Sequence, residues 1–175
     1  MESHAKAAGH PIHQQLVVFP LGLLGTAVVF DVLRMLTDNE AFATASHYMI
    51  AAGVLSGLVA AVFGLIDYLA IPASTRAKRI GLLHGVGNVV VVALFGLSWL
   101  LRVDEPDHIP GALAFLLALA GALLSVATGW LGGELVDRLG VGVDRDADLN
   151  APASLTTGIR ISRGEPVTPQ RSRPR

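Results

Sequence analysis

Four long apolar runs, separated by short polar stretches, limit this chain to very few folds. A bilayer core about 30 Å thick is crossed by roughly 20 helical residues at about 1.5 Å each. The runs comprise residues 16–36, 48–66, 80–101 and 109–133, and each lies in that length range. None shows the polar face at helical period that a helix of a soluble bundle presents to water. The sequence therefore predicts an all-α fold, a four-transmembrane-helix bundle.

The composition supports a membrane protein and excludes several kinds of site. Only 15% of the residues are charged, whereas soluble domains usually contain about 25% charged residues. The formal net charge of −1 gives no reason to expect nucleic acid as a partner. The chain has no cysteine, which excludes disulfides, thiolate metal ligands and covalent attachment of haem.

Basic residues in the connections predict the orientation of the bundle. Arg76, Lys78 and Arg79 lie between the second and third runs, whereas the first and third connections are mainly acidic. Because basic segments stay in the cytoplasm, we expect a multi-pass protein of the inner (plasma) membrane with both termini cytoplasmic. The expected divisions are a cytoplasmic N-terminal segment (1–15), the transmembrane domain (16–136), and a juxtamembrane segment with a disordered, Pro- and Arg-rich tail (137–175).

Small residues at a spacing of three or four mark the faces on which membrane helices approach one another. The fourth run carries Gly121, Ser125, Gly129 and Gly133, the second carries Gly53, Gly57, Ala60 and Gly64, and the third carries Gly81 and Gly85. We expect these faces to lie at helix–helix contacts, with Gly129 and Gly133 among the contact residues.

Polar residues concentrate in one layer at the predicted cytoplasmic ends of the helices. They are His10 and His13 before the first run, Asp67 after the second, His84 and Asn88 inside the third and Glu134 after the fourth. Ionisable groups at membrane depth are costly and usually face the interior of a bundle. Near the outer end, the first run also carries Asp31 and Arg34 on the face that begins at His13, which suggests an Asp–Arg pair.

One hypothesis is that non-covalent haem b carries electrons across the membrane. Four-helix bundles hold haem between histidines of facing helices. The residues available are His13 and His84 near the cytoplasmic end, with His10 and Asn88 as further cofactor-binding residues, and His47 and His108 near the outer end. If no ligand binds, His10 and His13 would simply begin a helix at the membrane surface, and His84 would form a hydrogen bond to a neighbouring helix.

Two alternatives remain open. Asp67, His84 and Glu134 could form a carboxylate–histidine metal site or a proton relay near the cytoplasmic face. The chain could instead be a structural partner subunit without a ligand. Lipid is the expected surrounding partner, and a redox or membrane-protein partner or a homo-oligomer is compatible with each alternative. Because the sequence has no nucleophile-elbow, phosphate-loop or zinc-protease motif, we do not predict an enzyme.

Several short motifs in combination resemble a known family. They are His10-Pro11-x-His13, Gly64-x-x-Asp67-Tyr68, His84-x-x-x-Asn88, and the stretch from Gly129 to Val136 followed by Gly140-Val141-Gly142-Val143. This set is similar to the domain-of-unknown-function family 2231 of predicted bacterial membrane proteins, over roughly residues 9–145. The resemblance implies a membrane bundle and points to the motif residues, and it implies no particular activity.

Overall fold

The computed structural model describes residues 1–155, and four long helical segments make up most of it. The first segment consists of α1 (Ile12–Leu16) and α2 (Val18–Thr37), the second of α3 (Glu40–Ala70), the third of α4 (Arg76–Leu100) and the fourth of α5 (Ala112–Gly133) with the π-helical turn η2 (Glu134–Arg138). A short 3-10 turn, η1 (Pro106–His108), precedes α5, and the strands β1 (Lys6–Ala7) and β2 (His10–Pro11) pair antiparallel ahead of α1. Residues 156–175, where most of the predicted disordered tail falls, lie outside the described residues.

Local sequence explains where several helices begin. Asn39 accepts a hydrogen bond from the Ala41 backbone N–H at the start of α3, and Thr75 accepts one from Lys78 at the start of α4. Such side-chain caps satisfy N–H groups that have no partner within the helix. Proline lacks an N–H, and its ring crowds the carbonyl four residues earlier. Pro20 therefore accounts for the interruption that separates α1 from α2.

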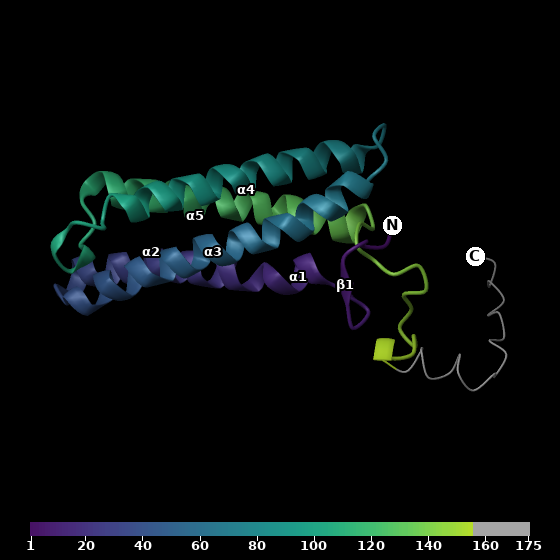
Figure 1. Cartoon of the computed structure of the whole chain (residues 1–175), viewed down its shortest axis with the longest axis horizontal. Coiled ribbons are helices and arrows are strands. Elements are labelled where there is room, and N and C mark those ends of the chain that lie inside the picture. The colour runs from purple at the N-terminus through teal and green to yellow at the C-terminus, as the bar shows by residue number, and fades with distance from the viewer. Residues whose placement is uncertain (156–175) are drawn as a thin grey trace.

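The helices form two antiparallel hairpins that lie side by side (Figure 1). The first hairpin contains α1, α2 and α3, and the second contains α4, α5 and η2, with the closest packing inside each hairpin. We call the end that carries residues 1–11 and the connection 71–75 the terminal end. We call the end that carries the connections 38–39 and 101–111 the distal end. Side chains of the two hairpins meet along a seam between them.

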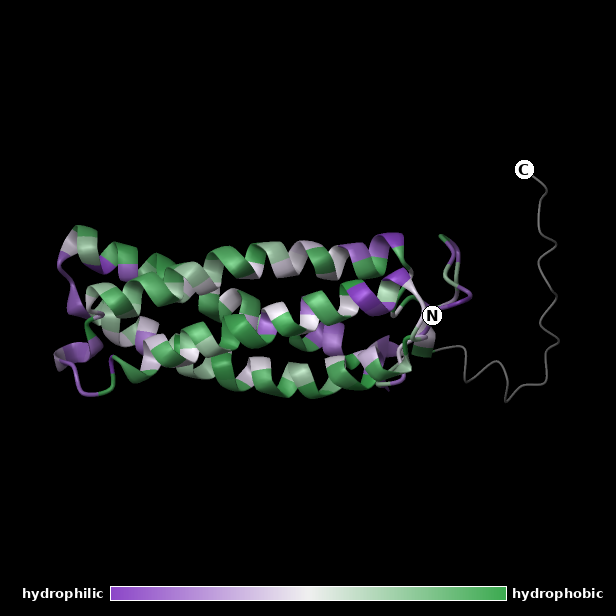
Figure 2. Ribbon diagram, turned by 90° about the horizontal axis from the view of Figure 1, so that it is seen from above, coloured by the Kyte–Doolittle hydropathy of each residue, from purple (hydrophilic) through white to green (hydrophobic). Residues whose placement is uncertain are grey.

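The surface of the bundle matches a bilayer. Colouring by hydropathy shows a mainly hydrophobic middle and hydrophilic ends (Figure 2). The four helical segments are long and apolar enough to span a membrane. Large apolar side chains such as Leu58, Val126 and Trp130 are exposed along the sides. The predicted four-transmembrane-helix bundle is therefore confirmed.

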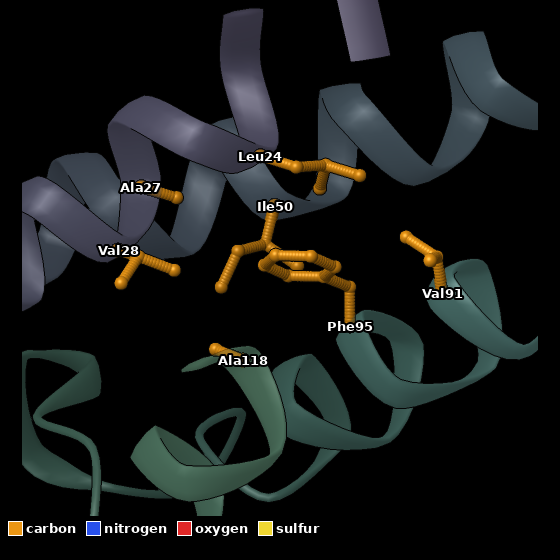
Figure 3. Packing of buried hydrophobic residues seen from close by; sticks show 7 residues of the cluster. All are labelled: Leu24, Ala27, Val28, Ile50, Val91, Phe95 and Ala118. Carbon is orange, nitrogen blue, oxygen red and sulfur yellow. The ribbon is translucent and has the colours of Figure 1, made fainter. Parts of the chain in front are cut away.

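A small apolar cluster fills the seam between the hairpins. Its members are Leu24, Ala27, Val28, Ile50, Val91, Phe95 and Ala118 (Figure 3). Phe95 is completely buried, and a Cβ atom at Gly121 would lie 2.8 Å from its ring. Gly121 therefore allows α5 to approach α4 closely, as the sequence predicts.

The glycine stripes lie only partly at helix contacts. Gly53 and Gly64 face side chains of a neighbouring helix, as predicted. The prediction for Gly129 and Gly133 is wrong within this chain. A Cβ atom at Gly129 would meet none of the described atoms within 4 Å, and at Gly133 it would meet only the Asp137 carboxylate of its own segment among them.

The rotation of α5 explains the error. In this part of α5, Thr128 and Gly132 contact α4, where they meet Gly87 and His84. The contacting face thus lies one residue away from the stripe that the sequence predicts. A spacing of four residues identifies a face of small residues, but it does not distinguish that face from its neighbour when both carry glycine.

Candidate functional site

The His13 ring is fixed to the first hairpin. Its Nδ1 lies 2.8 Å from the carbonyl oxygen of Ala60 on α3. A carbonyl only accepts hydrogen bonds, so Nδ1 carries a proton, and Nε2 is the ring nitrogen that can bind a metal. The ring rests on Gly64, where a Cβ atom would lie 2.8 Å from Cε1 of His13. The glycine therefore lets the imidazole reach the helix backbone.

The His84 ring is fixed to the second hairpin in the same way. Its Nδ1 lies 2.9 Å from the carbonyl oxygen of Thr128 on α5, and its ring rests on Gly132. Asn88 donates to the His84 carbonyl oxygen over 2.8 Å, and its side-chain oxygen accepts from the Thr128 hydroxyl over 3.2 Å. The Asn88 amide nitrogen also lies 3.3 Å from Nε2 of His84. Residues of α4 and α5 thus hold this ring jointly.

The two histidine rings meet across the seam between the hairpins. The centroids of His13 and His84 are 6.4 Å apart, and the ring planes are almost perpendicular, at 89°. An iron atom about 2 Å from one nitrogen of each imidazole places the two ring centroids roughly 6 Å apart. The observed separation fits that requirement. Histidine ligands of metals usually donate their other ring N–H to a carbonyl or carboxylate, as both rings do here.

Two of the predicted site residues, His10 and Asp67, form hydrogen bonds within or to the N-terminal segment. His10 is exposed, with Nδ1 3.1 Å from the Ala8 carbonyl oxygen. Asp67 accepts hydrogen bonds of 2.8 Å from the Ser3 hydroxyl and the His4 backbone N–H. Asp67 therefore fixes the N-terminal segment against α3.

The carboxylate–histidine set that the sequence suggests is not assembled. Glu134 forms an ion pair with Arg76 at 2.7 Å, and Asp67 is occupied by the N-terminal segment. Among residues 1–155, no group of three or more His, Asp or Glu side chains is placed to hold a metal ion. A haem with two protein ligands needs only one histidine on each side of the iron. In this layer, the fold brings together His13 and His84.

The distal end contains a buried ion pair between the hairpins. The guanidinium of Arg102 donates two hydrogen bonds of 2.8 Å to the carboxylate of Asp31, and both side chains are completely buried. Within residues 1–155, Asp31 thus pairs with Arg102, and the predicted pair of Asp31 with Arg34 is not formed.

Hydroxyl groups extend this ion pair to the other helices. Arg102 also donates to Ser46 on α3 and to Ser98 on α4. Ser98 in turn donates to the Ala114 carbonyl oxygen on α5 over 2.6 Å. All four helical segments therefore contribute to one buried polar network.

The two histidines at the distal end form a stack. The rings of His47 and His108 lie 3.8 Å apart and are nearly parallel, at 9°. His47 also stacks on Trp99, with centroids 5.2 Å apart. Two imidazoles packed face to face leave no room for iron between them, so His47 and His108 lack the geometry that haem binding between them, as considered from the sequence, would require.

The sequence pattern did not identify Thr128, which contacts His84, or Arg102, which pairs with Asp31. Thr128 lies in an apolar run and has no charge to mark it, and its role follows only from the rotation of α5 toward His84. A usable signal existed for Arg102. It follows an apolar run, and a cation at that depth requires a carboxylate such as Asp31.

Comparison with known proteins places the chain in a family. No curated protein and no solved structure matches it. A family model described as "Predicted membrane protein (DUF2231)" matches residues 9–145, which include all four helical segments. The match covers more than half of the chain and agrees with the resemblance seen in the motifs. The chain therefore belongs to the DUF2231 family of predicted membrane proteins.

Proposed function

We propose that this membrane protein binds one haem b between His13 and His84 and uses it to transfer electrons. The observation that carries the proposal is the pair of rings 6.4 Å apart across the seam. Each ring comes from a different hairpin, and each is oriented by a backbone carbonyl bound to Nδ1. Nε2 of His13 is therefore left as a ligand for a metal, and Nε2 of His84 becomes one when the Asn88 amide, 3.3 Å away, turns aside.

Two glycines set the positions of the rings. Gly64 and Gly132 let each imidazole lie against the backbone of the helix that fixes it, and the rings themselves fill that space. The rings lie in the seam, where the two hairpins pack less closely than the helices within each hairpin. Haem held there would supply one-electron chemistry, and the hydrogen bonds of the two histidines to backbone carbonyls would help to set its reduction potential.

We further propose that the terminal end faces the cytoplasm in the inner (plasma) membrane. Support comes from Arg76, Lys78 and Arg79 at this end, since basic connections remain in the cytoplasm. The proposed haem would then lie near the cytoplasmic face. Its electrons would pass to or from a redox partner at that face.

The test is an absorption spectrum of the protein purified from membranes, together with a haem assay. We expect a Soret band with about one haem per chain. His13→Ala and His84→Ala should each abolish the band, and added imidazole should restore it in part. His10→Ala is the matched control, because this exposed histidine lies three residues from His13, and it should retain the band. A folded protein that never takes up added haem would refute the proposal.

A further inference from the structure

Buried nitrogen atoms without partners gather at the distal end. In the described part of the chain, four buried side-chain polar atoms have no hydrogen-bond partner, namely Arg34 Nε, His47 Nδ1, Trp99 Nε1 and Arg102 Nε. All four are nitrogens that donate hydrogen bonds, or can do so in the case of the imidazole. An unpaired buried donor is costly, because it has lost its hydrogen bonds to water. Within residues 1–155, the distal end therefore lacks acceptors rather than donors.

Two of these donors belong to an aromatic stack. The His47 ring lies between Trp99, 5.2 Å away, and His108, 3.8 Å away. His47 is only 5% exposed, whereas its neighbour Tyr48 is 63% exposed. The Tyr48 ring stands almost at right angles to the stack, 5.5 Å from His47. The cluster thus runs from the interior to the side of the bundle that faces lipid.

The side-chain acceptors of the neighbouring polar network are already used. Asp31 accepts two hydrogen bonds from Arg102, and the Ser98 hydroxyl accepts a third. The charge of Arg102 is therefore balanced inside the bundle. The two unpaired donors of the stack belong to an indole and an imidazole, which do not neutralise a buried anion, so a neutral ligand with acceptor oxygens suits the stack better.

We propose that the distal stack binds the headgroup of a membrane quinone. Ring nitrogens donate in the plane of their rings, so the two unpaired donors lie at the edge of the stack. A quinone carbonyl oxygen at that edge would accept from His47 Nδ1 and Trp99 Nε1. The flat quinone ring would pack on the aromatic side chains, with Tyr48 on its path to the bilayer. Its isoprenoid tail would lie in the lipid.

The His108 side chain is the part of the stack that can give way to admit the ligand. It lies on the connection 101–111, and its backbone has a left-handed φ of 58°. Its ring is held through Nδ1 by the Arg102 carbonyl oxygen at 3.0 Å. Non-glycine residues rarely adopt this backbone conformation, so a different conformation of the connection costs little. Movement of this ring would widen the entry beside Tyr48.

The test is calorimetric titration of a quinone with a short tail into the protein in lipid nanodiscs, with empty nanodiscs as the blank. We expect saturable binding of one quinone per chain. Trp99→Phe and His47→Phe keep the aromatic packing and remove one donor each, and each should weaken binding about tenfold. Trp130→Phe is the matched control, because this tryptophan is exposed on the side of the bundle, and it should bind normally. His108→Ala should bind as tightly as the wild type or more tightly.

Two results would overturn the proposal. One is a wild-type protein that gives no saturable heat above the blank, which would mean that water or lipid satisfies these nitrogens. The other is equal affinity in Trp99→Phe, His47→Phe and Trp130→Phe. The Soret absorbance of the same samples reports on haem at the opposite end, so failure of this inference is distinguishable from failure of the proposed function.

Discussion

Gly64 and Gly132 occupy equivalent positions beneath two histidines on different hairpins. Each follows by four residues the carbonyl group that fixes its histidine, Ala60 for His13 and Thr128 for His84. A Cβ atom would lie 2.8 Å from His13 at the first position and 3.1 Å from His84 at the second. The two hairpins therefore hold their imidazoles by the same device.

The first prediction concerns these two glycines. Gly64→Ala and Gly132→Ala should displace the rings and weaken haem binding by about 10–100-fold, the usual effect of disturbing the groups that orient a metal ligand. The effect should be larger at Gly64, where the added atom comes closer. The measurement is titration of the haem-free protein with haemin.

Gly129→Ala is the matched control for this pair. It lies on the same helix as Gly132, and a Cβ atom there meets none of the described atoms within 4 Å. Alanine favours the helix over glycine by about 1 kcal/mol at each site, so the control corrects for that gain. Equal haem affinity in all three variants would contradict the arrangement described.

The second prediction concerns the buried pair Asp31–Arg102. Arg102→Leu leaves a buried carboxylate without its partner, which should lower the free energy of unfolding by about 3–5 kcal/mol. The double variant Asp31→Leu with Arg102→Leu removes both charges and should recover most of that loss. Unfolding in mixed micelles, followed by circular dichroism, measures the difference.

The ion pair Arg76–Glu134 provides the comparison. The Arg76 side chain is about half exposed, and exposed pairs contribute about 0–1 kcal/mol. Arg76→Ala should therefore change the unfolding free energy far less than Arg102→Leu does. Similar losses in these two single variants would mean that burial does not control the strength of the distal pair.

The third prediction concerns the hydroxyl of Thr128. Thr128→Val keeps the shape of the side chain and the carbonyl that binds His84, but it removes the hydrogen bond to Asn88. We expect haem affinity to fall about tenfold, because Asn88 then loses a partner that orients the His84 segment. Ser125→Ala is the control, since the Ser125 hydroxyl bonds within its own helix to Ala122. Haemin titration of both variants measures the effect, and no difference between them would show that the Asn88 contact is unimportant.

The fourth prediction concerns orientation. The chain has no cysteine, so a single introduced thiol reports on one site. Ser74→Cys lies in the connection at the terminal end. In intact cells, where a membrane-impermeant thiol reagent reaches only the outer face, this cysteine should not be labelled. Asp104→Cys, in the distal connection, should react readily. Labelling of Ser74→Cys without labelling of Asp104→Cys would show that the orientation is the opposite of the one proposed.

The four spans could be predicted because apolar length alone determines them. A helix that crosses a bilayer needs no particular partner to be recognised, and the runs at 16–36 and 109–133 satisfy that criterion without reference to the rest of the chain. Helix rotation is different. Gly129 and Gly132 are both small, and only the packing of α5 on α4 determines which of the two faces inward.

The histidines of the candidate site could be predicted from the sequence, but the distance and orientation of their rings could not. His84 is recognisable because a polar residue inside an apolar span usually faces the bundle interior. Its closeness to His13 follows from the way the two hairpins meet, which no local pattern specifies. Asp67 illustrates the opposite case, because its partners Ser3 and His4 belong to an N-terminal segment whose path is not apparent from periodicity.

The distal ion pair also has a consequence for biosynthesis. Asp31 enters the membrane in the first span, but Arg102 follows 71 residues later, after the third. At about 5–20 residues per second, the ribosome takes roughly 4–14 s to supply that partner. During this time the first hairpin holds an uncompensated acid, which is tolerable only near the lipid headgroups. We therefore expect the first hairpin to reach its final depth and packing only after the second is made, so that the two halves of the bundle complete their insertion together.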